Sequence, residues 1–110
     1  MVDEEAYRRE LEYLSRYAHD DWLGCSVVSG TVGGLLGRGA PFEEQLALFL
    51  RIAGDLYDAG ARPGDLTESE RDPFLPWTTD RADGLARIEA EVGAHRRLPD
   101  SGDVCWFTVP

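Results

Sequence analysis

The sequence predicts a mainly α fold, a compact bundle of about four helices with a small C-terminal β element. Three segments repeat apolar residues at helical spacing between capping residues and chain breakers, and part of residues 22–37 also suits a helix. Residues 104–109 then form a short run of β-prone side chains. A length of 110 residues fits one core, so we expect residues 1–110 to form a single globular domain.

The first predicted helix covers residues 3–18. Acidic residues occupy its first turn, where the helix dipole favours negative charge. Its apolar face consists of Tyr7, Leu11, Leu14 and Ala18. His19, Asp20 and Asp21 then interrupt the apolar pattern, and either aspartate can cap a second helix that starts at Trp22.

Residues 22–39 hold six of the twelve glycines. Small residues recur every fourth position in two rows, Ser26, Gly30 and Gly34, and Ser29, Gly33 and Gly37. On a helix these rows let another backbone approach closely, either inside the fold or across a subunit boundary. A strand over residues 25–32 is the alternative, and the sequence leaves both open. Residues 22–37 are uncharged but are too short and too rich in Gly, Ser and Thr to span a bilayer.

Two further helices are predicted after residue 40. The first covers residues 41–59, with Pro41 at its opening, acids in its first turn and Gly60 at its end. Its apolar face consists of Phe42, Leu46, Phe49, Ala53 and Leu56. The second has Thr79 or Asp80 as its cap and continues to about His95.

The connection between these helices, residues 61–80, contains three prolines and a Pro-Gly turn and is predicted to be a loop. We expect its aromatic residues, Phe74 and Trp77, to fold it back onto the core. One strand cannot stand alone, so residues 104–109 need a partner. An extended piece at residues 65–67 is the evident candidate.

The charge balance and the composition disfavour or remove several function classes. Against 21 acidic residues stand 11 basic ones, all arginine, and the net charge is −10. This field disfavours binding of nucleic acid or an anionic membrane and favours a basic partner. The absence of lysine removes Schiff-base chemistry and the Walker A loop, and the glycines do not follow the dinucleotide-binding order. Because the N-terminus lacks the pattern of a secretory signal, we expect a cytoplasmic protein.

No metal and no cofactor are predicted. The residues that could bind zinc are scattered singly, without the paired spacing that zinc sites show. They are His19, Cys25, His95 and Cys105. Two cysteines are few for a secreted disulfide scaffold, and both have apolar neighbours, so we expect buried reduced thiols.

Residues 65–83 hold six acids against two arginines, with Phe74 and Trp77 among them. Acids around aromatic anchors suit a surface that docks a basic protein. A solvated loop whose aromatic residues fill the core is the alternative. The predicted partner contacts are Asp65, Glu68, Glu70, Asp72, Trp77, Asp80 and Asp83.

The C-terminal part of the chain resembles a pattern found in short bacterial proteins, F-x-P-W, then Arg-Ile, then P-x-x-G-[DE]-[IV]-x-W-[FL]. The matching residues are Phe74, Pro76, Trp77, Arg87, Ile88, Pro99, Gly102, Asp103, Val104, Trp106 and Phe107. Some proteins of this kind resemble immunity proteins, which neutralise a cognate toxin by binding it. The resemblance implies a binding role and no catalytic residues, and its positions correspond to a turn, a helix face and an edge strand.

The leading hypothesis is therefore a small acidic binding protein, an immunity protein that neutralises a basic, nuclease-type bacterial toxin by stoichiometric binding. The first alternative is a structural or regulatory subunit of a homodimer or larger assembly that uses an apolar helix face. The second alternative is an enzyme with an unrecognised carboxylate site. Asp20 and Asp21 are the adjacent pair to consider, although neighbouring residues point in different directions.

Overall fold

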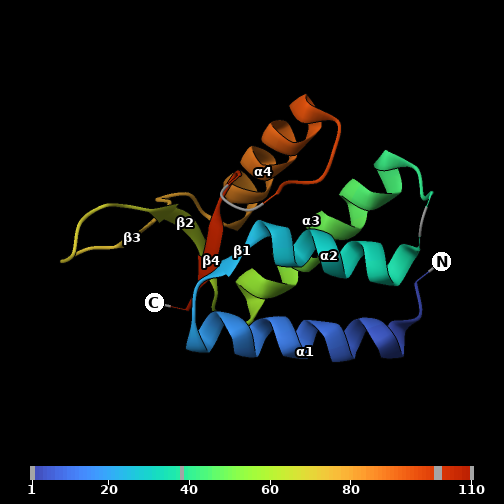
Figure 1. The fold of residues 1–110 in the computed structure, drawn as a ribbon, viewed down its shortest axis with the longest axis horizontal. Helices are drawn as coiled ribbons and strands as arrows, with labels where there is room; N and C mark the ends of the chain where they lie inside the picture. The colour runs from blue at the N-terminus through green and yellow to red at the C-terminus, as the bar shows by residue number, and fades with distance from the viewer. Residues whose placement is uncertain (1, 38, 101–102, 110) are drawn as a thin grey trace.

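Helix α3 lies at the centre of the structure, and the three other helices pack against it (Figure 1). The computed structural model describes residues 2–37, 39–100 and 103–109. The helices are α1 (Glu4–Asp20), α2 (Cys25–Leu36), α3 (Phe42–Asp58) and α4 (Arg81–His95). The strands are β1 (Leu23–Gly24), β2 (Arg62–Leu66), β3 (Phe74–Pro76) and β4 (Trp106–Thr108).

Within the described residues, the prediction of a mainly helical fold with four helices is confirmed. The β structure differs from the prediction, because it is not confined to the C-terminal part of the chain. The four strands of the described part of the chain join in one antiparallel sheet in the order β1-β4-β2-β3, so the fold combines a helical layer with a small sheet (Figure 1).

Helix α1 begins at a capped first turn. The Asp3 carboxylate accepts a hydrogen bond from the backbone N–H of Glu5 at 3.1 Å. Its apolar face is buried through Tyr7, Leu14 and Ala18. The helix continues two residues past the predicted end, to Asp20.

Tyr7 connects α1 to α3. Its hydroxyl donates a hydrogen bond to the Asp55 carboxylate at 2.6 Å, and the Arg51 guanidinium lies 3.8 Å from the centre of its ring. The side chain is only 4% exposed. Burial and the adjacent Asp55 carboxylate, which would repel a phenolate, raise the pKa of Tyr7 above its ordinary value of 10.0.

This raised pKa predicts a loss of stability at alkaline pH. Below pH 10 the Tyr7 phenol is protonated in both the folded and the unfolded chain, so its contribution is complete there. Above that pH the unfolded chain releases the proton first, and the free energy of unfolding falls. Tyr7→Phe is expected to lower the free energy of unfolding by about 2 kcal/mol at neutral pH, because it removes the hydrogen bond.

Urea denaturation from about pH 8 to pH 11 checks this prediction. The difference in unfolding free energy between the wild-type protein and Tyr7→Phe should shrink above pH 10. All other side chains are shared by the two proteins, so their contributions cancel in the difference. A difference that does not change with pH contradicts the assignment.

The second helix starts later than predicted. Leu23 and Gly24 form strand β1, and α2 begins at Cys25 instead of Trp22. Gly24 has extended backbone, and its missing side chain lets the Trp106 ring of β4 pack on it, since a Cβ there would lie 3.0 Å from the ring. Residues 25–36 are helical, so the strand alternative for residues 25–32 is wrong.

The glycines of the small-residue rows of α2 do not pack inside the fold, whereas Ser29 donates a hydrogen bond to the carbonyl of Pro99 at 2.7 Å. The helix buries its other side through Cys25, Val28 and Val32. A Cβ added at Gly30, Gly33 or Gly34 would meet no atom within 4 Å. For these glycines, close contact inside the fold is therefore contradicted. Among the described residues, no helix is long and apolar enough to cross a bilayer.

The end of α3 and the start of α4 lie where local capping signals predict them. Gly60, with φ of +100°, follows the last turn of α3, and the N–H groups of Gly60 and Ala61 close that turn on Tyr57 and Leu56. At the start of α4 the Asp80 carboxylate accepts a hydrogen bond from the N–H of Asp83 at 2.8 Å. Asp80 is thus the cap, and Thr79 is not.

The C-terminal strand pairs with a different part of β2 than predicted. Arg62, Pro63 and Gly64 pair with β4, and Gly64, Asp65 and Leu66 pair with β3. The predicted loop thus contains a strand at residues 74–76. Proline disfavours helical backbone for the residue before it, and because it lacks an N–H it is tolerated in an edge strand such as β3, so Pro73 and Pro76 are compatible with this strand.

Candidate partner-binding surface

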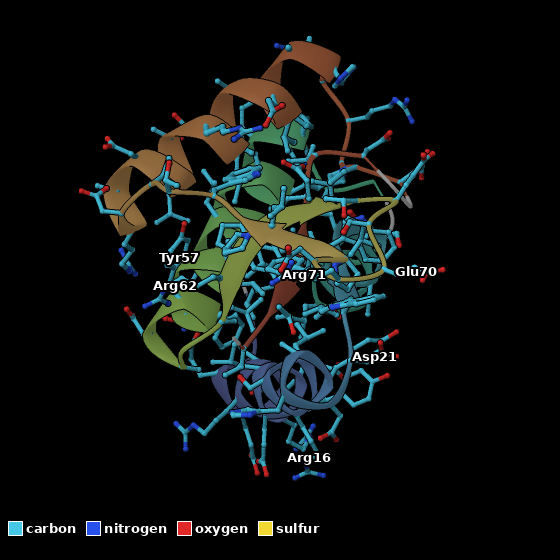
Figure 2. All side chains as sticks on the ribbon, turned by 90° about the vertical axis from the view of Figure 1, so that its left-hand side faces the viewer. Arg16, Asp21, Tyr57, Arg62, Glu70 and Arg71 are labelled. Atoms are coloured by element: carbon cyan, nitrogen blue, oxygen red, sulfur yellow. The ribbon has the colours of Figure 1, made fainter. Side chains whose placement is uncertain are left out.

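The most prominent surface feature is an arm formed by β2, β3 and the turn between them. Figure 1 shows it extending away from the helices, and in Figure 2 it faces the viewer. We call residues 65–76 the acidic hairpin. Its turn is held by its own hydrogen bonds: the Thr67 hydroxyl donates to the carbonyl of Asp72 at 2.6 Å, and the Ser69 hydroxyl accepts from the N–H of Asp72 at 3.1 Å.

Four of the predicted contacts lie on the acidic hairpin, and all four are exposed. They are Asp65, Glu68, Glu70 and Asp72. The seven ion pairs found among the described residues use other carboxylates. The hairpin holds a single arginine, Arg71, which is labelled beside Glu70 in Figure 2. Its negative charge is therefore not neutralised within the described parts of the chain.

Two leucines add apolar surface to the acidic hairpin. Leu66 is 36% exposed and Leu75 is 53% exposed. Leu75 stands opposite Asp65 in the ladder, so the two side chains share one face of the hairpin. Neither leucine is among the predicted contacts, because residues 61–80 are predicted to be a loop with at most an extended piece at residues 65–67, and the contacts are inferred from charge and aromatic residues. Because Phe74, Leu75 and Pro76 are consecutive apolar residues, no alternation of polar and apolar side chains marks this strand in the sequence.

Trp77 lies in the core, so it does not provide an exposed anchor. Its side chain is 8% exposed, and the Arg87 guanidinium lies 3.7 Å from the centre of its ring. The indole N–H donates a hydrogen bond to the Asp65 carboxylate at 3.2 Å. For Trp77, the alternative in which an aromatic residue of this segment fills the core is therefore correct. The contact between Trp77 and Arg87 also fixes the base of the hairpin to α4.

The other side of the hairpin base is held by Arg62. Its guanidinium donates hydrogen bonds to the carbonyls of Tyr57 and Ala61 at 3.2 Å and 2.8 Å and lies 5.4 Å from the centre of the Tyr57 ring. Figure 2 shows Arg62 and Tyr57 side by side. The arm is thus attached to both α3 and α4.

The remaining two predicted contacts lie at the start of α4. Asp80 and Asp83 are exposed, and Asp80 caps the helix. Within the described residues, no hydrogen bond or ion pair joins either of them to the acidic hairpin. The structure therefore divides the predicted contacts into an acidic hairpin, a buried tryptophan and a helix terminus.

A groove at the end of α1 was not singled out from the sequence. It has a volume of about 360 Å³ and is lined by Tyr13, Arg16, Tyr17, Asp20 and Asp21. Figure 2 shows Arg16 and Asp21 at this end of the molecule. The Asp21 carboxylate accepts a hydrogen bond from the N–H of Trp22 at 2.7 Å and so holds the chain as it leaves α1.

The comparisons with known proteins leave the family open. No family model, curated protein or solved structure matches this chain. Among the described residues, no group of three or more His, Cys, Asp or Glu side chains could hold a metal ion. One residue of the C-terminal pattern, Gly102, lies outside the described residues. The geometry of the acidic hairpin is therefore the main guide to function.

Proposed function

We propose that this chain is a cytoplasmic immunity protein that neutralises a basic, nuclease-type bacterial toxin by stoichiometric binding. The observation that supports the proposal is the acidic hairpin, an arm with four exposed carboxylates and no ion pair among the described residues. A nuclease presents a cationic cleft to nucleic acid. Carboxylates along an arm can occupy such a cleft in place of phosphate groups.

The two exposed leucines supply apolar surface that can be desolvated on binding, which charge alone does not provide. Carboxylates at a rim mainly raise the association rate, whereas residues that are desolvated at the centre of an interface contribute most of the affinity. Leu75 and Asp65 share a face of the acidic hairpin. The proposed contact set is therefore Asp65, Leu66, Glu68, Glu70, Asp72 and Leu75, with Asp80 and Asp83 as flanking charges and Trp77 as internal support.

Charge reversal on the hairpin tests this proposal. The variant Glu68→Lys, Glu70→Lys and Asp72→Lys leaves the turn intact, because the turn uses side chains of Thr67 and Ser69 and only the backbone of Asp72. The probe is a purified basic protein encoded beside the gene for this chain. Stopped-flow association at low salt is expected to slow by about 10- to 100-fold, with a weaker dependence on salt.

A matched control separates the hairpin from net charge. The variant Glu10→Lys, Asp20→Lys and Glu89→Lys changes the net charge by the same amount, at three exposed acids outside the hairpin. Its association rate should stay close to that of the wild-type protein. Equal slowing in both variants contradicts a hairpin contact. An adjacent basic protein that is neither bound nor inhibited at a one-to-one ratio contradicts the immunity function itself.

The exposed side of α2 favours a second candidate function, that of a subunit of a homodimer or larger assembly. Residues 22–37 carry no charge, and Gly30, Gly33 and Gly34 face open space. Two copies with a net charge of −10 repel each other least through an uncharged face. Light scattering without any added partner distinguishes the candidates, since a stable dimer supports assembly and a monomer supports binding of another protein.

A further inference from the structure

The two cysteines meet although they are far apart in the sequence. β1 and β4 pair Leu23 with Phe107 and Gly24 with Trp106. The next position in this register places Cys25 opposite Cys105. Their sulfur atoms lie 3.3 Å apart, and the two side chains are 0% and 2% exposed. The end of the β1–β4 ladder therefore holds two adjacent buried thiols.

This arrangement is close to the geometry of a disulfide. Directly opposed residues of antiparallel strands have Cβ atoms about 4.5–5.5 Å apart, and a disulfide requires about 3.5–4.5 Å. A small inward movement of the two side chains is enough to join the sulfur atoms. The pair also spans the fold, because Cys25 starts α2 and Cys105 immediately precedes β4.

We propose that Cys25 and Cys105 form a site of reversible oxidation, at which a small-molecule disulfide such as oxidised glutathione converts the two thiols into an intramolecular disulfide. One protein thiol loses its proton, attacks a sulfur of the oxidant and expels one glutathione thiolate. The second protein thiol, also deprotonated, attacks the resulting mixed disulfide and expels the other. Two electrons pass to the oxidant, and the two protons are taken up by the two glutathione thiolates.

The reaction proceeds through a local opening of the sheet. The hydrogen bond with Cys25 and burial raise the pKa of Cys105, so the Cys105 thiol stays protonated in the closed sheet, and the burial of both side chains keeps oxidants away from the pair. β1 has two residues and β4 has three, so few hydrogen bonds hold this ladder together. Its separation exposes both thiols while the helices remain folded.

The bond changes the stability of the sheet. It closes a loop across 80 residues of sequence, and long loops are the ones whose closure most reduces the freedom of the unfolded chain. β4 lies between β1 and β2, so a covalent link to α2 also fixes the strand against which β2 packs. This inference concerns the fold of the chain and does not depend on the proposed toxin partner.

Equilibration in glutathione redox buffers tests the site. The fraction of chain with an intramolecular disulfide is measured by intact mass after acid quenching, in native buffer and in concentrated urea. The folded protein is expected to favour the disulfide by about 1,000-fold over the unfolded chain, because the fold holds the thiols together. The oxidised protein should also melt about 10 °C or more above the reduced protein.

The variants Cys25→Ala and Cys105→Ala provide the controls. Neither can form the bond, so their melting temperatures should be the same in oxidising and reducing buffer. Three results would overturn the proposal: equal disulfide formation in native buffer and in urea, disulfide-linked dimers as the main product, or an oxidised protein that melts no higher than the reduced one. If both variants fail to fold, the disulfide fraction and the melting temperatures of the wild-type protein still test the proposal.

Discussion

A Gly64→Ala variant is expected to lose about 3 kcal/mol of its free energy of unfolding. A Cβ at this position would lie 2.5 Å from Cζ of Phe74 and 2.8 Å from Cα of Pro76, and it would also meet the backbone oxygen of Leu75. Two of these three atoms belong to the backbone of the neighbouring strand, so a side-chain rotation cannot relieve the overlap. β2 and β3 must separate, and urea denaturation measures the loss.

Gly93→Ala is the matched control for this prediction. Gly93 lies in α4, and a Cβ there would meet no atom within 4 Å. The same change in composition should therefore raise the free energy of unfolding by up to about 1 kcal/mol, because alanine favours the helix. A Gly64→Ala variant as stable as the wild-type protein would show that the hairpin does not need this close approach.

The triple variant Gly30→Ala, Gly33→Ala and Gly34→Ala is expected to gain stability, by about 2–3 kcal/mol. All three glycines lie within α2, none has a positive φ, and each has open space where a Cβ would be placed. Alanine lowers the entropy of the unfolded chain and introduces no contact that must be relieved. Urea denaturation at a protein concentration at which the chain is monomeric measures this gain.

This variant also tests the role of the exposed face of α2. If the glycines serve contact with another backbone, the stabilised variant should lose self-association while remaining folded, as measured by light scattering. If they have no such role, stability rises and the oligomeric state does not change. A loss of stability in the monomer would contradict the exposed placement of the three residues.

The parts of the fold that the sequence predicted well depend on local signals. α3 lies between Pro41 and Gly60, and α4 starts at the Asp80 cap, so each boundary is encoded within a few residues of itself. The parts that could not be predicted depend on distant partners. Leu23 and Gly24 form a strand because residues 106–107 pair with them, and no sequence signal near residue 24 indicates that partner.

The candidate site shows the same division. Its charge was predicted, since acidic residues can be counted in the sequence. The burial of Trp77 depends on Arg87 and Asp65, one on a helix and the other on a strand, so an aromatic residue among acids could equally have been exposed. The proximity of Cys25 and Cys105 depends on a register that spans the whole fold. Composition therefore indicated the kind of surface, and tertiary pairing decides which residues form it.

The position of β4 between β1 and β2 has a consequence for the order of folding. β4 follows α4 in the chain, so during synthesis it emerges after every helix and after both strands that it joins. Helices α1, α2 and α3 can associate early, through contacts between neighbours in sequence. Until β4 inserts, β1 and β2 are left with unpaired edges, and the acidic hairpin lacks its attachment to the rest of the sheet. A nascent chain therefore gains its helical core before β4 joins the strands of the acidic hairpin to β1 in one sheet.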